Sequence, residues 1–321
     1  MKYIKYFLII LALLIVAVIA LEYVNSKPKK AKQNPYEYNV DEFKQVDSTL
    51  VSHFEKRQIK VKLNGRAGLT TFDGKIYLVA NSNLSVISPE GRLLSSFSVP
   101  TDTRAVAVST TNIAIAGKKQ VSVFDHSGNF GYSTPIVSDS SVYTSVAFWD
   151  GDIVVADAGK RLVYIFKNEE LIAEIEGISG IENLHGFIVP SARFDLAVNN
   201  DNELWVVNPG MHALQQYTRR GALAGSWDKA SLTIEGFSGC CNPAQICTLN
   251  DGRIVTSEKS MPRIKIYSRN GDLLSVVAPP SAFGNNIEAS EIAAIGETIV
   301  ALDTEQQLIR IFEKKMETQN N

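Results

Sequence analysis

IVVADAGKRLVYIF, residues 153–166, contains two short apolar runs separated by a polar loop. Runs of about five residues that are rich in Val, Ile, Tyr and Phe and bounded by turn residues are typical of β-strands. We therefore predict that Ile153–Ala156 and Leu162–Phe166 are two strands joined by a loop. The rest of the chain is interpreted outward from this pair of strands.

The same pair of strands recurs six times along the chain, and internal repetition of this kind is typical of repeat folds. The first member of the pair occurs at Ile76–Ala80, Ile113–Ala116, Ile153–Ala156, Leu204–Val207, Ile254–Ser257 and Ile299–Leu302. The second member occurs at Leu84–Ser88, Val121–Asp125, Leu162–Phe166, Ala213–Tyr217, Arg263–Tyr267 and Leu308–Phe312.

Turn signals surround these pairs and imply further strands on either side. They are Asp73-Gly74, Asp150-Gly151 and Asp251-Gly252 before the pair, and Glu90-Gly91, Ser127-Gly128 and Asn270-Gly271 after it. Each repeat therefore reads as four antiparallel strands, which is the blade of a β-propeller. We predict an all-β domain over residues 57–313, a six-bladed β-propeller of four-stranded blades.

The sixth repeat ends at Phe312 without a fourth strand. Gln58–Leu63 (QIKVKL) alternates as a strand but precedes the first repeat. We predict that this N-terminal strand closes the ring as the outer strand of the last blade, because closure removes exposed sheet edges.

An unbroken apolar run, Phe7–Leu21, lies between Lys2 and Lys5 on one side and Lys27 on the other. With its interfacial ends the run has about the length that crosses a bilayer as a helix. We predict that residues 1–25 are a transmembrane anchor, with the N-terminus cytoplasmic and the propeller extracytoplasmic or periplasmic. A cleaved signal peptide ending near Ala20 is the alternative.

The segment between anchor and propeller, residues 26–56, is expected to be a linker rich in Lys, Pro and Asn followed by a short amphipathic helix. Phe43, Val46, Leu50, Val51 and Phe54 recur there at helical spacing. Residues 314–321 are expected to be a disordered tail. The formal net charge of −2 gives no sign of a nucleic-acid partner.

The sequence of the repeat resembles that of the NHL-repeat family. The segments most similar to it are IVVADAGKRLVYIF and LWVVNPGMHALQQY (residues 204–217). The resemblance covers most of the chain and implies a six-bladed propeller, but it implies little about function. GFSGCCNP (residues 236–243) resembles a segment of a bacterial NHL subgroup. In that subgroup Cys often stands at the position of Ser238 and His at that of Gln245, so this chain departs at both.

Loops that join the second strand to the third, and one blade to the next, emerge on one face of a propeller. The long loops all fall on this loop-rich face, and binding residues usually lie on such loops. The candidate ligand-binding residues there are His185, Asn208, His212, Cys240, Cys241, Glu258 and Arg263.

Cys240 and Cys241 allow three interpretations. They are packed thiols, a strained vicinal disulfide, or part of a metal site. Their Cα atoms are about 3.8 Å apart if the peptide is trans, below the usual disulfide range. Zinc normally needs four ligands, and we predict no metal.

Aligning the inner strands by their turns places Arg104, Gln245 and Glu291 in one ring at the tunnel mouth. They are candidate ligand contacts or solvated rim charges. A second ring directly follows the second strands and is expected to cap loops by binding backbone amides. Its members are Asn81, Gly117, Asp157, Asn208, Glu258 and Asp303.

These features favour a membrane-tethered binding module that recognises a protein, peptide or small molecule and needs no cofactor. Two alternatives stay open. One is a metal-dependent lyase or hydrolase at the tunnel mouth, which some NHL propellers resemble. The other is a redox-active Cys240–Cys241 pair.

Overall fold

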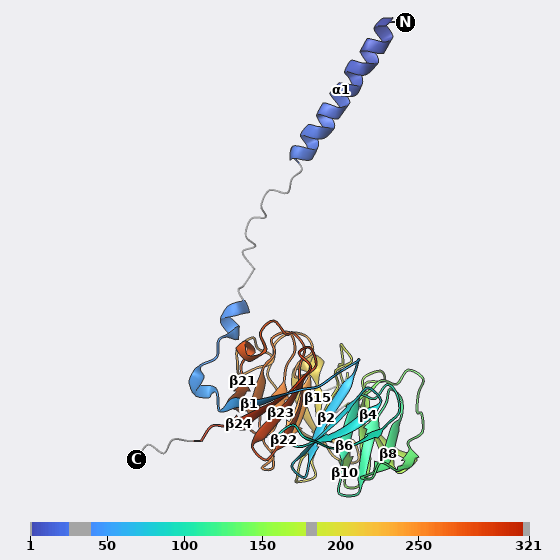
Figure 1. Ribbon diagram of the computed structural model, residues 1–321, viewed down its shortest axis with the longest axis vertical. Coiled ribbons are helices and arrows are strands. Elements are labelled where there is room, and N and C mark those ends of the chain that lie inside the picture. Colours follow the sequence, from blue (N-terminus) through green and yellow to red (C-terminus); the bar gives the residue numbers. More distant parts are fainter. Residues whose placement is uncertain (1, 26–39, 178–184, 317–321) are drawn as a thin grey trace. The chain divides into compact units, whose positions relative to one another are not determined.

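The computed structural model describes residues 2–25, 40–177 and 185–316. An N-terminal helix, α1 (Lys2–Asn25), belongs to one compact unit and the β domain to another. The β domain contains six four-stranded antiparallel sheets arranged as the blades of a propeller (Figure 1). The predicted fold class is therefore confirmed.

In blades 1 to 5 the strands follow one another from the inner to the outer position in chain order, whereas the outer strand of blade 6 is β1. Blade 1 is β2 (Ala67–Phe72), β3 (Lys75–Ala80), β4 (Asn83–Ile87) and β5 (Leu93–Ser98). Blade 2 is β6 (Ala105–Val108), β7 (Asn112–Ala116), β8 (Val121–Asp125) and β9 (Phe130–Ser133). Blade 3 is β10 (Tyr143–Trp149), β11 (Asp152–Asp157), β12 (Leu162–Lys167) and β13 (Glu170–Ile175).

Blade 4 is β14 (Leu196–Val198), β15 (Leu204–Asn208), β16 (Ala213–Tyr217) and β17 (Leu223–Asp228). Blade 5 is β18 (Gln245–Thr248), β19 (Ile254–Ser257), β20 (Ile264–Tyr267) and β21 (Leu273–Ala278). Blade 6 is β22 (Glu291–Ile295), β23 (Thr298–Asp303), β24 (Leu308–Lys314) and β1 (His53–Lys60).

The position of a strand in its blade sets its sequence pattern. Second strands such as β15 are buried on both faces, because neighbouring blades cover both sides of them. They are therefore almost continuously apolar. The outer strand β17 alternates between half-buried and exposed residues, since its outward face meets solvent.

The closing strand β1 pairs antiparallel with β24, with Ile59 opposite Ile309, as predicted. It begins at His53, earlier than the sequence pattern indicated. The His53 ring bonds the backbone carbonyl of Glu297 through Nε2 at 2.9 Å. Arg310 on β24 donates two hydrogen bonds, of 2.7 and 2.8 Å, to the carboxylate of Glu55 on β1.

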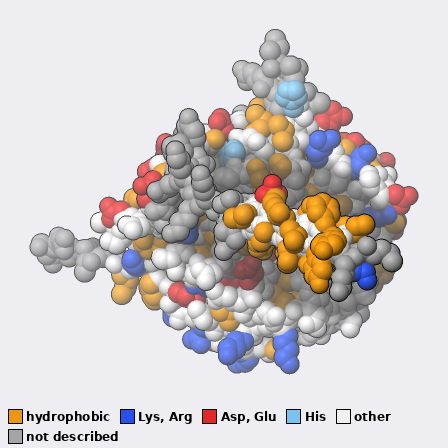
Figure 2. Space-filling view, turned by 90° about the horizontal axis from the view of Figure 1, so that it is seen from above, with side chains coloured by type: hydrophobic (Ala, Val, Ile, Leu, Met, Phe, Trp, Pro, Cys, Tyr) orange, Lys and Arg blue, Asp and Glu red, His pale blue; other side chains and the backbone are white. Residues whose placement is uncertain are grey.

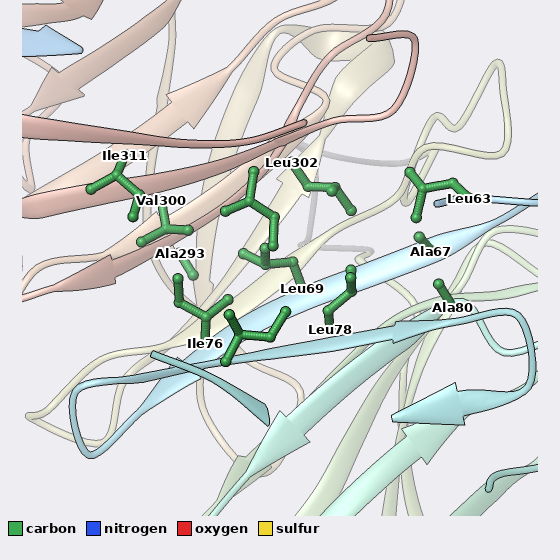
Figure 3. Close-up of a cluster of buried hydrophobic side chains, with 12 residues drawn as sticks. Leu63, Ala67, Leu69, Ile76, Leu78, Ala80, Ala293, Val300, Leu302 and Ile311 are labelled. Atoms are coloured by element: carbon green, nitrogen blue, oxygen red, sulfur yellow. The ribbon is translucent and has the colours of Figure 1, made fainter. Parts of the chain in front are cut away.

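The join between the first and last blades is sealed by apolar side chains from both (Figure 3). Leu69, Ile76 and Leu78 of blade 1 pack in one cluster with Val300 and Leu302 of blade 6. The ring is thus closed by backbone pairing at its edge and by hydrophobic packing between its ends.

The prediction of an amphipathic helix before the propeller is wrong. Two 3-10 turns, η1 (Val40–Lys44) and η2 (Ser48–Leu50), precede β1 instead. Val51 bridges Val276 on β21, and the amide of Ser52 bonds the Val276 carbonyl. Backbone pairing with blade 5 therefore overrides the helical spacing of the apolar residues. The predicted tail begins too early, because Lys314 ends β24 and the amide of Lys315 bonds the Ser52 carbonyl. The linker at 26–39 and the rest of the tail at 317–321 lie outside the described residues.

The expected capping ring is present on the loop-rich face. The Asp157 carboxylate accepts from the amides of Val142, Gly159 and Lys160. The Asp303 carboxylate likewise accepts from the amide of Gln306. These residues hold loops in place, as their position after the second strands predicted.

Helix α1 contains one apolar stretch, Tyr3–Tyr23, that is long enough to cross a membrane. None of this stretch is buried within the protein, and its apolar side chains contribute to the hydrophobic surface seen in Figure 2. A signal sequence near an N-terminus has the same features.

We expect ring closure to decide whether the propeller folds. A chain that begins at residue 43 keeps β1 and should give a monomer with a cooperative thermal transition. A chain that begins at residue 61 lacks β1, which leaves β24 as an unpaired edge, and should aggregate or lose that transition. Circular dichroism and size-exclusion chromatography measure both, and equal behaviour of the two chains would contradict the role given to β1.

Candidate functional site

The inner strands of all six blades line a central tunnel with a cavity of about 540 Å³. A second hollow, of about 480 Å³, lies at the loop-rich end of the tunnel. We call this hollow the basic mouth, and it is lined by Gly65, Arg66, Ala67, Arg104, Thr144, Ser191, Ala192, Arg193, Gln245, Lys259, Glu288, Glu291 and Thr304. Tunnel and mouth share Thr144, Gln245 and Glu291, so the two spaces adjoin.

Arg104 lies directly before β6 and lines the basic mouth with a side chain that is only 8% exposed. Its Nη2 donates to both carboxylate oxygens of Asp102, at 3.2 and 3.3 Å. Its Nε and Nη1 atoms are buried and have no hydrogen-bond partner among the residues that the structure describes. A buried guanidinium with two free donors is a ready binding group for an anion.

Three further cations, which the sequence interpretation did not single out, surround Arg104. They are Arg66, Arg193 and Lys259. The pKa of Arg66 is lowered by burial and by the positive charges of Arg104 and Arg193. Arg66 lies directly before β2, as Arg104 lies before β6, and Arg193 lies three residues before β14. That shared position was the signal that could have found them.

Glu291 and Gln245, two of the predicted mouth residues, contact each other, with Gln245 Nε2 donating to Glu291 Oε1 at 2.7 Å. Burial and the nearby Asp195 raise the pKa of Glu291 to about 8, although Arg193 opposes the shift from 3.8 Å. Glu291 is therefore mostly protonated at neutral pH. Arg193 forms its closer ion pair with Glu288, at 2.5 Å. The basic mouth keeps more positive than negative charge.

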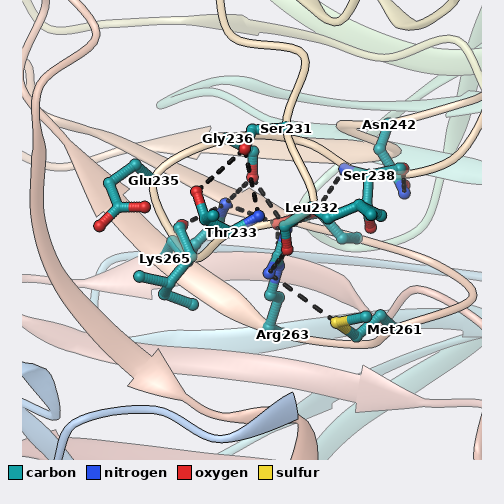
Figure 4. Close-up of polar contacts among 12 residues, drawn as sticks. Ser231, Leu232, Thr233, Glu235, Gly236, Ser238, Asn242, Met261, Arg263 and Lys265 are labelled. Atoms are coloured by element: carbon teal, nitrogen blue, oxygen red, sulfur yellow. Dashed lines mark hydrogen bonds and ion pairs between the residues drawn. The ribbon is translucent and has the colours of Figure 1, made fainter. Parts of the chain in front are cut away.

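Glu258 and Arg263 were expected to contact a ligand, but both side chains are fully buried. Arg263 donates to both Glu258 oxygens and to the Gly236 carbonyl, and Lys265 donates to the same carbonyl at 2.6 Å (Figure 4). Burial lowers the pKa of Lys265 to about 8 despite Glu258. This ion cluster holds the cysteine loop, residues 229–242, in place through the Gly236 carbonyl. Because its charged side chains are fully buried, they cannot reach a ligand on the surface.

Asn208 is also fully buried and plays a structural part. Its side chain accepts from the amide of Ile188 and donates to the Gly186 carbonyl. His212 contacts the Gly239 carbonyl through Nε2, which places it against the cysteine loop. His185 is exposed at the edge of the described residues.

Cys240 and Cys241 lie side by side with their sulfur atoms 3.2 Å apart and unbonded. Cys240 is exposed, whereas Cys241 is 2% exposed. Among residues 2–25, 40–177 and 185–316, no three His, Cys, Asp or Glu side chains are grouped as metal ligands. His185 and His212 are thus not joined there by carboxylates or thiols into the metal site that the lyase alternative needs.

Neither a comparison with protein-family models nor one with curated protein sequences finds a match. Many solved structures share the fold. A gluconolactonase from Xanthomonas campestris has a TM-score of 0.59 at 13% identity, with 84% of this chain and 94% of that chain covered.

Two other solved structures are similarly related. The calcium-binding protein regucalcin from Agrobacterium tumefaciens has a TM-score of 0.54 at 12% identity, with 83% of this chain and 94% of that one covered. A catalytically inactive virginiamycin B lyase from Staphylococcus aureus, with quinupristin, has a TM-score of 0.54 at 15% identity, with 81% of this chain and 99% of that chain covered. At this level of identity the likeness shows that the chain has the fold of a six-bladed β-propeller.

Replacing Glu258 with Gln should lower the free energy of unfolding by about 3 kcal/mol or more, because Arg263 and Lys265 would be left as buried cations without a counter-ion. Glu313→Gln is the matched control, since its pair with Lys56 is exposed and should change stability by less than about 1 kcal/mol. Denaturant titration measures both. A loss at Glu258 no larger than at Glu313 would contradict the structural role of the cluster.

The raised pKa of Glu291 makes stability depend on pH. Its pKa rises from 4.5 in the unfolded chain to about 8 in the folded protein, so the folded state binds the proton more tightly. The stabilisation of the folded state by this proton is fully present below pH 4.5 and is lost as the pH rises through 8. The free energy of unfolding should therefore fall less between pH 5 and 8 in Glu291→Gln than in the wild type. The free energy of unfolding is measured by thermal or denaturant unfolding. If it changed equally with pH in the two proteins, the raised pKa of Glu291 would be contradicted.

Proposed function

We propose that the propeller is a binding module that recognises an anionic group of its ligand in the basic mouth. The unsatisfied guanidinium of Arg104 carries this proposal. Leaving buried donors unpaired is costly. An anion in the mouth would accept a hydrogen bond from one of these two nitrogen atoms, because their N–H groups lie on different edges of the guanidinium. Arg66 and Lys259, which line the same hollow, add positive charge without specifying one geometry.

The protonated state of Glu291 supports the same ligand. A second carboxylate in the mouth would repel an anion, whereas a neutral carboxyl group can donate a hydrogen bond to it. A free inorganic anion and an acidic group on a larger molecule present the same chemistry to these residues, and the long loops around the mouth leave room for the larger one.

We further propose that α1 tethers the module to a membrane, with the propeller outside the cytoplasm. The apolar helix, which is not buried within the protein, supports the tether. A reporter that is active only in the periplasm, fused after Phe312 and expressed in a bacterial host, tests it. A fusion active only with a cytoplasmic reporter would reverse the topology.

An enzyme is the second candidate, and Glu291 is the observation in its favour. A carboxyl group with a pKa near 8 inside a cavity suits a general acid at neutral pH. Among the proteins that share the fold, one is a lyase and one a gluconolactonase. Turnover of a lactone that is lost in Glu291→Gln would favour this candidate over the binding module.

Replacing Arg104 with Gln should weaken binding of citrate or inorganic phosphate to the detergent-solubilised protein by about 10- to 100-fold. That is the range expected for one hydrogen-bonded charge, about 1.5–3 kcal/mol. Arg104→Lys should give an intermediate loss, because it keeps the charge and loses the fork of donors. Arg92→Gln, an exposed arginine near the turns of the opposite face, is the control. Isothermal titration calorimetry that finds all four proteins equal, or finds no binding by the wild type, would refute the anion site.

A further inference from the structure

The two adjacent thiols lie at the rim of the basic mouth and have unequal access to solvent. The exposed sulfur of Cys240 lies 3.2 Å from the sulfur of Cys241, which is behind it. Cys241 interacts with Ser191 and Lys259, both of which line the mouth. Lys259 Nζ in turn lies 3.5 Å from Ser191 Oγ. A molecule in the solvent therefore reaches the Cys240 sulfur before that of Cys241.

The loop holds the two thiols in place before any reaction. Asn242 donates to the carbonyls of Ser238, at 2.6 Å, and Lys259, at 3.0 Å, and it accepts from the Lys259 amide at 2.9 Å. His212 contacts the carbonyl of Gly239, which directly precedes the pair. A pair of thiols that is already ordered loses little conformational freedom when its sulfur atoms react together.

The groups around the two sulfur atoms determine which of the two thiols loses its proton first. Burial raises the pKa of Cys241, but hydrogen bonds from Cys240 and Ser191 and the Lys259 ammonium outweigh it and lower the pKa overall. The hydrogen bond to Cys241 raises the pKa of Cys240. Cys241 therefore carries the negative charge of the singly ionised pair, and Cys240 carries the proton.

We propose that Cys240 and Cys241 form a thiol–disulfide exchange site, in which exposed Cys240 attacks a disulfide-bearing substrate and Cys241 resolves the mixed disulfide. Lys259 is its positioning residue. This proposal does not depend on anion binding at Arg104, because it rests on the sulfur geometry and on the contacts of Cys241.

The reaction balances without a cofactor. Cys240 passes its proton to the Cys241 thiolate and attacks a substrate disulfide RSSR, which forms Cys240–S–SR and releases RS⁻. Cys241 then gives that proton to the released thiolate, which leaves as RSH. The Cys241 thiolate attacks the Cys240 sulfur and expels the second RS⁻. The substrate disulfide is reduced by two electrons, and the protein gains a Cys240–Cys241 disulfide.

The product has a property that suits repeated exchange. The peptide between the two cysteines is trans, since the described cis bond is Asn242-Pro243. The Cα atoms are then about 3.8 Å apart, short of the roughly 4.4 Å where ordinary disulfides begin. Strained disulfides are reduced more easily, so an external thiol returns the pair to its starting state.

Dithionitrobenzoate, an aromatic disulfide, tests the proposal on the reduced full-length protein in detergent. The wild type should release two aromatic thiolates and lose two hydrogen atoms in mass without keeping an aromatic group. Cys241→Ser should release one thiolate and keep one aromatic group on Cys240. Cys247→Ala should behave as the wild type, because Cys247 is packed against the core. A wild type that keeps an aromatic group on Cys240 would overturn the proposal.

Lys259 has a separate test in the pH dependence of the reaction rate. Lys259→Met should move the half-maximal rate to higher pH and slow the reaction at neutral pH by about tenfold for each unit of pKa, and Lys259→Arg should restore most of it. An unchanged pH profile in Lys259→Met would remove Lys259 from the site. The profile separates an electrostatic role from a merely structural one, since loss of structure would expose both thiols and accelerate labelling.

Discussion

The pairing of β1 with β24 is the constraint on which the whole propeller depends. It joins residues from the two ends of the domain, and the core between blades 1 and 6 can form only when both ends are present. Each of the other five sheets is built from consecutive strands and could begin to form locally. The last sheet instead requires the complete ring, so it makes the fold cooperative rather than a loose array of repeats.

A closed ring also explains how like charges can be kept together at its mouth. Arg66, Arg104 and Arg193 would separate on a flexible loop, because their repulsion would be relieved by movement. Here each precedes an inner strand whose position is fixed by the neighbouring blades. The stability of the ring offsets the repulsion, which a bound anion would remove. Functional sites often contain such locally unfavourable groups.

The blades could be predicted from the sequence because each repeat carries the same strand and turn signals. The same alignment brought Arg104, Gln245 and Glu291 together at one mouth, where the structure also has them. Arg66, Arg193 and Lys259 were missed because they lie in connections, whose paths depend on tertiary contacts. Glu258 follows β19 and Arg263 precedes β20, but sequence position does not show that a long charged side chain turns inward to a buried partner. The spacing at 43–54 favoured a helix because it contains no sign of the strand edge at Val276.

The closing strand is also the first strand after α1. If the N-terminus were held at a membrane, tension on it would first load the pairing of Val51 and Ser52 with Val276 and then the hydrogen bonds between β1 and β24. Those bonds, the Glu55–Arg310 pair and the buried ring of His53 would resist the load together. The mechanical strength of the β1–β24 pairing would thus set how much force on the N-terminal end of the domain the ring can resist before it opens.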